Sequence, residues 1–329
     1  MATKKAGRWG LFTPFLIAGV LFGGYTAYWF VVARTIQAQA PAIMAALNAD
    51  TGSPWRYSYE TLTVTGFPYR FAIDLEAPTA TDREAGQTWR VEAARATVLP
   101  YNLFHAVIQA RGDVIGERGG VRDTVVRHEN ATFGVRYTAQ GAVKDAAFSA
   151  DRIEIETGAG GRLQIEAPSL QLGLAPSDPS VTRVQAQAET IAADGALSAV
   201  LLGHENAQTL FLALEARWAE GRDGEGLALI QPLPTGAYRV LGLGGVLGGS
   251  TLQVTGDGFV DETGRLIGRA DVSASDLGFL DNVVGGDARN ALRLATMLSG
   301  DLKLPVAFEE DRTTLLGVRA YGPVYIVRP

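Results

Sequence analysis

The side chains able to do chemistry are few in this chain of 329 residues, and their spacing gives no reactive set. There is no cysteine, which excludes disulfides, thiolate metal sites and cysteine nucleophiles. The three histidines, His105, His128 and His204, lie far apart and have no partner at a metal-ligand spacing. No G-x-S-x-G nucleophile elbow occurs, and the acidic residues are scattered along polar strand faces. We therefore expect no enzyme activity, no metal and no cofactor.

A glycine-rich stretch over residues 242–249 is the nearest approach to a nucleotide-binding loop. A dinucleotide fingerprint needs a strand before it and a helix after it, whereas a predicted strand follows here at Thr251. A P-loop needs Lys-Ser or Lys-Thr, which the stretch lacks. Nucleotide binding is therefore not expected.

The short segment whose residues restrict the backbone most clearly is Gly66-Phe67-Pro68-Tyr69-Arg70. Gly66 permits an unusual backbone angle, while Pro68 fixes its own angle and withholds a hydrogen-bond donor. The simpler interpretation is a turn that starts a strand at Tyr69, and the alternative is a functional motif.

The first structural element that the sequence predicts is a run of uncharged residues, Trp9–Ala33. As a helix this run would rise roughly 37 Å, which is enough to span a bilayer. Lys4, Lys5 and Arg8 precede it, so the positive-inside rule predicts a cytoplasmic tail over residues 1–8 and places the rest of the chain outside the cytoplasm.

The ends of the run carry aromatic residues, which are predicted to sit at the two membrane interfaces: Trp9, Tyr25, Tyr28 and Trp29. Gly19 and Gly23 form a G-x-x-x-G pair, which could let two such helices approach closely, and the alternative is that the two glycines are incidental in an apolar helix. The alternative to an anchor is a signal peptide cleaved after the small-x-small sequence at 38–40. The apolar run exceeds the roughly 7 to 15 residues of a signal h-region, which favours an uncleaved anchor.

Residues 34–54 carry apolar side chains at helical spacing and are predicted to form a stem helix and linker. Pro41 either kinks this helix or marks its start. Residues 1–34 hold four basic residues and no acidic one, so the remainder has 25 basic against 35 acidic residues. Such an acidic domain repels phosphate backbones, so nucleic acid is not an expected partner. An extracytoplasmic compartment also suits a chain without thiols.

From residue 55 to residue 329 the apolar period changes to 2, which predicts half-buried strands joined by short turns. The expected fold is mainly β: a curved, mostly antiparallel amphipathic sheet that forms a groove or a sandwich in the periplasm. The apolar parity flips at Pro168-Ser169, which predicts a bulge or a break. A hairpin is predicted over 251–275 and a helix over 276–300. Further strands are expected near 302–308, 313–316 and 324–327.

The candidate ligand site is the apolar side of these strands, which the sheet must cover with itself, with helices or with a ligand. Its predicted members are Phe71, Ile73, Leu75, Phe133, Val135, Ile153, Ile155, Leu163, Ile165, Leu252, Val254 and Val272. Because predicted helices are few, a groove around an apolar ligand is favoured.

The order of several short motifs along the chain resembles the alphaproteobacterial domain of unknown function 2125. After the anchor and stem, these motifs are Tyr57 and Tyr59, the box Gly66–Arg70, Pro100–Asn102, Asp276-Leu277, Leu302–Pro305 and Gly322-Pro323. Tyr69 stands where the family box has a second phenylalanine. Near the end, Glu309–Arg312 replaces an acidic-glycine turn, which puts the last hairpin in doubt.

More remotely, the layout is similar to AsmA-like envelope proteins, whose amphipathic sheets curl into a groove for lipid tails. On the order of 14 strands at about 4.8 Å would make a groove on the order of 65 Å long. We expect a single-pass inner-membrane protein of a Gram-negative bacterium, with its bulk in the periplasm, that binds lipid or another apolar ligand for envelope maintenance or lipid transfer. The alternative is an interaction module in which two sheets pack without a cavity and an acidic exterior docks an envelope protein complex.

Overall fold

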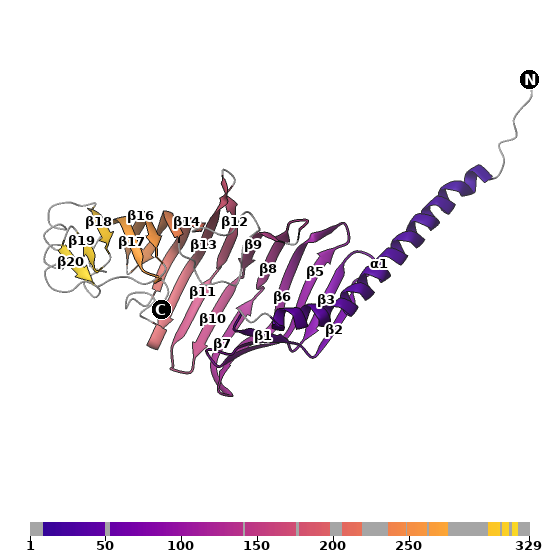
Figure 1. Ribbon diagram of the computed structural model, residues 1–329, viewed down its shortest axis with the longest axis horizontal. Helices are drawn as coiled ribbons and strands as arrows, with labels where there is room; N and C mark the ends of the chain where they lie inside the picture. The colour runs from indigo at the N-terminus through magenta and orange to yellow at the C-terminus, as the bar shows by residue number, and fades with distance from the viewer. Residues whose placement is uncertain are drawn as a thin grey trace, which may run out of the picture.

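The computed structural model describes residues 9–49, 53–140, 142–175, 178–197, 206–218, 236–247, 249–261, 263–275, 302–309, 311–315 and 318–321. Within these ranges the protein is mainly β, with one long N-terminal helix followed by a large antiparallel sheet (Figure 1). The described strands curl into a partial ring and do not close into a barrel. The predicted fold class is therefore confirmed.

The helix α1 (Trp9–Ala49) runs without interruption through both the predicted membrane segment and the predicted stem, and Pro41 lies inside it. Its 41 residues extend roughly 60 Å, about twice the hydrocarbon thickness of a bilayer. Figure 1 shows α1 crossing the first strands and then projecting away from the sheet toward the N-terminus. Its length and apolar composition are sufficient to cross a membrane.

The strands of the first half of the sheet are β1 (Trp55–Ser58), β2 (Thr61–Thr65), β3 (Phe71–Glu76), β4 (Thr79–Asp82), β5 (Gln87–Leu99), β6 (Asn102–Arg118), β7 (Val121–Glu129), β8 (Thr132–Tyr137), β9 (Val143–Ser149) and β10 (Arg152–Thr157). The strands of the second half are β11 (Arg162–Glu166), β12 (Ser169–Ala175), β13 (Asp178–Asp194), β14 (Asn206–Trp218), β15 (Gly236–Leu247), β16 (Ser250–Val260), β17 (Leu266–Ala274), β18 (Leu302–Phe308), β19 (Thr313–Leu315) and β20 (Val318–Tyr321). Each described pairing is antiparallel. Short turns connect several of the successive strands, such as β5 with β6 and β16 with β17.

Several long strands are interrupted once, so each appears as two halves: β1 with β2, β3 with β4, β7 with β8, β9 with β10, and β11 with β12. The uninterrupted strand β6 pairs with β7 near its C-terminal end and with β8 near its N-terminal end. Likewise β13 pairs with both β11 and β12. The two halves of each interrupted strand therefore lie end to end within one sheet.

The interruptions lie beside one another and form a line across the sheet, which we call the crease. Ala77, Asn130 and Ala167 lie on it with positive φ angles of 46°, 53° and 47°. The Asp151 N–H donates to the carbonyl of Glu129 at 2.9 Å, and the Ala167 N–H donates to the carbonyl of Asp151 at 2.8 Å. An irregular residue of this kind shifts the two-residue period of a strand.

The crease accounts for the parity flip in the sequence. The break predicted at Pro168-Ser169 is confirmed, since β11 ends at Glu166 and β12 begins at Ser169. The apolar side chains also switch from even-numbered to odd-numbered positions between β7 and β8, for example from Val126 to Phe133. One register shift therefore recurs on adjacent strands instead of being a local defect.

The hairpin predicted over 251–275 is confirmed as β16 and β17, in which Val254 lies opposite Val272. Its turn is held by the Asp261 carboxylate, which accepts from the Thr263 N–H at 2.9 Å and from the Arg265 N–H at 3.0 Å. The doubtful last hairpin also forms, because β18 pairs with β19 and the Glu309 N–H donates to the carbonyl of Arg312 at 2.8 Å. The helix predicted over 276–300 and the strand predicted over 324–327 lie outside the described residues.

Candidate functional site

Two rows of apolar residues cross the sheet side by side on one face, which we call the apolar face. Residues directly opposite each other on antiparallel strands point to the same side of the sheet. The first row contains only apolar residues on thirteen strands: Val64, Ile73, Ala96, Ile108, Phe133, Phe148, Leu170, Ala186, Leu212, Leu243, Val254, Val272 and Leu304. The second row is Phe71, Val98, Ala106, Val135, Ala146, Leu172, Val184, Leu214, Val240, Gly256, Ala270 and Val306. At about 4.8 Å per strand, the first row is roughly 58 Å long.

Most side chains of the two rows are half-buried. Val135 is 1% exposed, whereas Leu243 on the same face is 39% exposed. Among the described residues α1 is the one α-helix, and it contacts the first strands of the sheet, β1 and β2, together with Phe71 of β3 and Val98 of β5. The apolar face from β6 onward is therefore not covered by any described α-helix.

The helix α1 covers the first end of the apolar face. Trp29 is 3% exposed and its indole stacks on Phe71, which is fully buried. Ala33 joins this cluster, and Val64 and Val98 of the two rows pack against it. The rows of the apolar face therefore begin at the helix.

Four side chains of α1 also donate hydrogen bonds to backbone carbonyls of the β-rich part of the chain, and one of them is Asn48, which donates to Tyr57 at 2.8 Å. The Tyr25 hydroxyl donates to Pro68, the Tyr28 hydroxyl donates to Pro100 at 3.2 Å, and the Trp29 Nε1–H donates to Arg70 at 3.1 Å. Trp29 was expected at a membrane interface because of its place in the apolar run, but it is buried between α1 and the sheet. The aromatic residues at this end of the run therefore fix the helix to the protein.

The box Gly66–Arg70 is the turn on which α1 rests. The N–H groups of Tyr69 and Arg70 both donate to the carbonyl of Gly66 at 3.1 Å, so the strand begins at Phe71 and not at Tyr69 as predicted. Gly66 has φ 103°, and a Cβ at this position would lie 2.7 Å from the Arg70 carbonyl oxygen. Only glycine fits this turn. Phe67 carries three ring contacts to α1, with Phe22, Trp29 and Phe30.

The predicted groove residues fall into two groups. Eight lie on the strands that form the apolar face: Phe71, Ile73, Leu75, Phe133, Val135, Leu252, Val254 and Val272. The other four lie beyond the crease on β10 and β11, where Ile153 is opposite Ile165 and Ile155 is opposite Leu163. The sequence did not reveal that Phe148, Leu170 and Leu212 join these rows, although their two-residue spacing carried the signal.

Gly19 and Gly23 lie on the exposed part of α1, and nothing approaches within 4 Å of a Cβ at either position. The described part of the sheet does not cover this segment of the helix, since residues 12–24 are all exposed. The contact between two helices through this pair stays a prediction.

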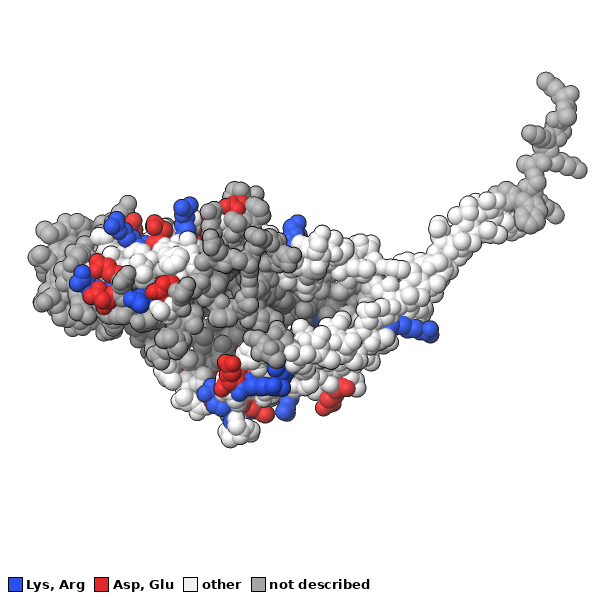
Figure 2. Space-filling view, in the orientation of Figure 1, with Lys and Arg blue, Asp and Glu red and all other residues white. Residues whose placement is uncertain are grey.

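The opposite face of the sheet carries a row of mostly charged residues in register: His105, Arg136, Asp145, Gly173, Arg183, Glu215, Arg239, Asp257 and Arg269. Arg136 and Asp145 are 3.0 Å apart, and Arg183 and Glu215 are 2.5 Å apart. Opposite charges on neighbouring strands stabilise a solvated sheet face. Figure 2 shows charged side chains gathered on the sheet and few on α1, whose one charged residue in the sequence is Arg34.

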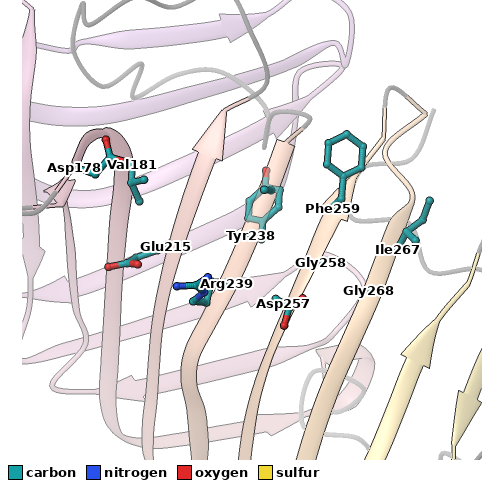
Figure 3. Close-up of a pocket in the computed structure, with 11 residues that line it drawn as sticks. Asp178, Val181, Glu215, Tyr238, Arg239, Asp257, Gly258, Phe259, Ile267 and Gly268 are labelled. Atoms are coloured by element: carbon teal, nitrogen blue, oxygen red, sulfur yellow. The ribbon is translucent and has the colours of Figure 1, made fainter.

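A cavity of about 800 Å³ lies over this charged row on β13 to β17. Figure 3 shows Glu215, Arg239 and Asp257 on neighbouring strands at one side of it, with Phe259 and Ile267 at the other. The Arg239 guanidinium stands between the carboxylates of Glu215 and Asp257 in the register, and Asp178 also lines the cavity, so its described lining carries three acidic side chains and one basic one. Its described lining also contains no nucleophile and base pair that would indicate catalysis.

Beyond the crease, Glu156 stands between Arg127 and Arg162. Its carboxylate lies 3.0 Å from the Arg127 Nη2 and 2.8 Å from the Arg162 Nη2. Hydrogen bonds from Arg127 and then from Arg162 lower the pKa of Glu156 to about 2. This ladder ties β7, β10 and β11 together on their polar side.

Two of the three histidines, His105 and His128, fall within the described residues and lie on different strands, while His204 lies outside them. His128 is in a row with Ile153, Ile165 and Ile191, and both of its ring nitrogens are shielded without a hydrogen-bond partner among the described residues. No group of three His, Asp or Glu side chains suitable for a metal occurs in the described part of the chain.

Most of the chain matches the model of one protein family. The model of a family described as "Uncharacterized protein conserved in bacteria (DUF2125)" matches residues 29–319. The match begins at Trp29, the residue that fixes α1 to the sheet. No curated protein matches the chain.

Proposed function

The chain belongs to the DUF2125 family, and we propose that it is a single-pass membrane protein whose apolar face holds lipid or another apolar ligand. Its N-terminus would lie in the cytoplasm and its sheet in the periplasm, next to the inner membrane. The role that fits this arrangement is envelope maintenance or lipid transfer. An extended sheet with one apolar face is also the feature that would relate it to AsmA-like envelope proteins.

The observation that carries the proposal is the first row of the apolar face. It stays apolar over thirteen strands, and the described helix covers only its first end. Burial of apolar area is worth about 25 cal/mol per Å², so a ligand that covers such a surface gains free energy without any specific polar contact. A length of roughly 58 Å gives room for more than one acyl chain along the row.

An uncleaved anchor is supported by the packing of α1. Cleavage at the 38–40 sequence would remove Trp29 and Ala33 from the cluster around Phe71. Loss of a buried tryptophan typically costs about 3–5 kcal/mol. Intact-mass measurement of the membrane-extracted protein should show residues 1–40 still attached, and a shorter mass that begins after Ala40 would contradict the anchor.

The test of ligand binding uses a benzophenone amino acid at Phe148 and, separately, at Leu170 of the full chain. The matched controls are the neighbouring positions Ala147 and Gln171, which lie on the opposite face. After irradiation of intact bacterial cells, mass spectrometry should find lipid adducts at the two apolar positions and none at the controls. Equal labelling of both faces, or no lipid adduct at either apolar position, would refute the proposal.

The second candidate is an interaction module that docks an envelope protein complex. The charged row on the opposite face favours it, because exposed complementary charges steer protein association. In the same experiment this candidate predicts defined protein adducts at Ala147 and Gln171. Protein adducts at Phe148 and Leu170 would instead assign the apolar face itself to a protein partner.

A further inference from the structure

Five exposed apolar side chains gather beside α1 on the turn before β3 and on the turn and first residues that lead into β6, and we call them the aromatic rim. Phe67 and Tyr69 belong to the turn between β2 and β3 and are 37% and 81% exposed. Tyr101, Leu103 and Phe104 follow β5 and are 84%, 47% and 51% exposed. The pairing of β3 with β5 brings the two turns to the same end of the sheet.

The position of the rim along α1 is fixed by contacts. Its first turn holds Phe67 against Phe22, with ring centroids 6.3 Å apart, and against Phe30 at 5.6 Å. Its second turn accepts the hydrogen bond from Tyr28 at the Pro100 carbonyl. Phe22 is the residue of α1 nearest the N-terminus that has a ring contact to the sheet among those described, so α1 leaves the sheet at the rim.

The depth of the rim follows from helix geometry. At about 1.5 Å per residue, Tyr25 and Trp29 lie roughly 24 Å and 30 Å along the helix from Trp9. The hydrocarbon layer of a bilayer is about 30 Å thick. A membrane that contains the free part of α1 with Trp9 at one interface therefore has its other interface at the level of the rim.

The chemistry of the rim suits that level. Tyrosine combines an apolar ring with a polar tip and is enriched at membrane interfaces. Arg70, on the first turn, and Arg34, five residues after Trp29 on α1, have exposed side chains that would bring positive charge toward lipid phosphates. Other exposed apolar residues of the sheet, such as Val121 and Phe259, lie away from α1 on other strands.

We propose that the aromatic rim inserts into the headgroup region of the same bilayer that α1 spans, so that the sheet stands on the membrane and the apolar face begins at the lipid surface. This inference rests on the membrane anchoring in the proposed function. It assigns the box Gly66–Arg70 a double role, since its backbone carbonyls receive α1 while Tyr69 meets lipid.

The absence of cysteine allows a direct test. Single substitutions Tyr69→Cys, Tyr101→Cys and Phe104→Cys in the full chain are labelled with an environment-sensitive nitrobenzoxadiazole dye. The protein is reconstituted in phosphatidylcholine–phosphatidylglycerol vesicles with lipids spin-labelled near the headgroup or deep in the acyl chain. The control Val121→Cys is 69% exposed and lies at the opposite end of the β6–β7 hairpin.

The three rim labels should be quenched several-fold more by the shallow spin label than the label at Val121. A further variant, Val20→Cys in the exposed part of α1, should be quenched by the deep spin label. If Val20 is not quenched, membrane anchoring itself fails. If Val20 is quenched and the rim labels match Val121, anchoring stands and the rim proposal is overturned. Rim labels that are shielded only in native membranes, and not in pure lipid, would overturn it in favour of a protein partner.

Discussion

The indole of Trp29 stacks on the ring of Phe71, with ring centroids 5.3 Å apart and an angle of 17° between the planes. The same indole donates its N–H to the carbonyl of Arg70, one residue before Phe71. A residue inside the apolar N-terminal run is thus a core residue of the sheet. The helix and the sheet therefore form one packed unit, in which the anchor cannot be removed without opening the core.

Replacement of Trp29 should release the first end of the sheet. We expect Trp29→Ala to lower the free energy of unfolding by about 3–5 kcal/mol, because it deletes a buried aromatic ring. Trp29→Phe keeps a ring but loses the donor to Arg70 and should cost about 1 kcal/mol for the hydrogen bond. Val31→Ala, at a 63% exposed position on the same helix, is the control. Chemical unfolding in detergent micelles measures all three, and equal effects of Trp29→Ala and Val31→Ala would contradict the packing.

A glycine substitution at the crease should stabilise the protein, which is the reverse of its usual effect within a strand. Ala167 has φ 47°, a left-handed conformation that costs an L-residue roughly 1–2 kcal/mol. We therefore expect Ala167→Gly to raise the free energy of unfolding by about 1 kcal/mol. The same substitution at Ala147, within the regular strand β9, should lower it by roughly 0.5–1 kcal/mol. Thermal or urea unfolding checks the pair, and effects of the same sign at both positions would argue against a left-handed residue at the crease.

The ladder around Glu156 predicts acid sensitivity. Its pKa in the folded protein is about 2, below the ordinary value of 4.5, because Arg127 and Arg162 favour the carboxylate. The stabilisation is therefore present above pH 4.5 and is lost as the pH falls through about 2. We expect the urea midpoint of the native protein to fall over this range more steeply than that of Glu156→Gln. Parallel curves for the two proteins would show that these hydrogen bonds do not contribute.

His128 should be replaceable by an apolar residue. A shielded polar group without a hydrogen bond costs about 1–3 kcal/mol, and the neighbours of His128 in its row are isoleucines. We expect His128→Leu to increase the free energy of unfolding by about 1 kcal/mol, and His128→Gln to give no increase. Calorimetric or urea unfolding distinguishes the variants. A clear destabilisation by leucine would mean that the imidazole has a polar partner, such as a bound ligand.

Part of the fold could be predicted from local patterns. The two-residue alternation predicted the strands, and the parity flip at Pro168-Ser169 predicted the break between β11 and β12. The same alternation predicted a hairpin over 251–275, which the structure contains as β16 and β17. These features depend on residues close together in the chain, so the sequence carries them directly.

The candidate site could be predicted only in part. The apolar side of each strand was evident, but the two rows arise from pairings between strands that are often not consecutive, such as β6 with β8 and β9 with β12. A shift of one residue in any pairing would turn a strand's apolar side to the opposite face. The alternation within one strand does not specify which residues of the neighbouring strand lie opposite it.

The sequence by itself determined the apolar helix, the amphipathic strands and the glycine turn at residue 66, because composition and local backbone freedom act within a few residues. Only the tertiary structure decided that Trp29 belongs to the core, and that the turn seats α1. These relationships join residues 41 to 72 positions apart, as in the hydrogen bonds of Trp29 to Arg70 and of Tyr28 to Pro100. Such contacts are chosen by the packing of the folded chain, where helix and sheet together remove apolar surface from water.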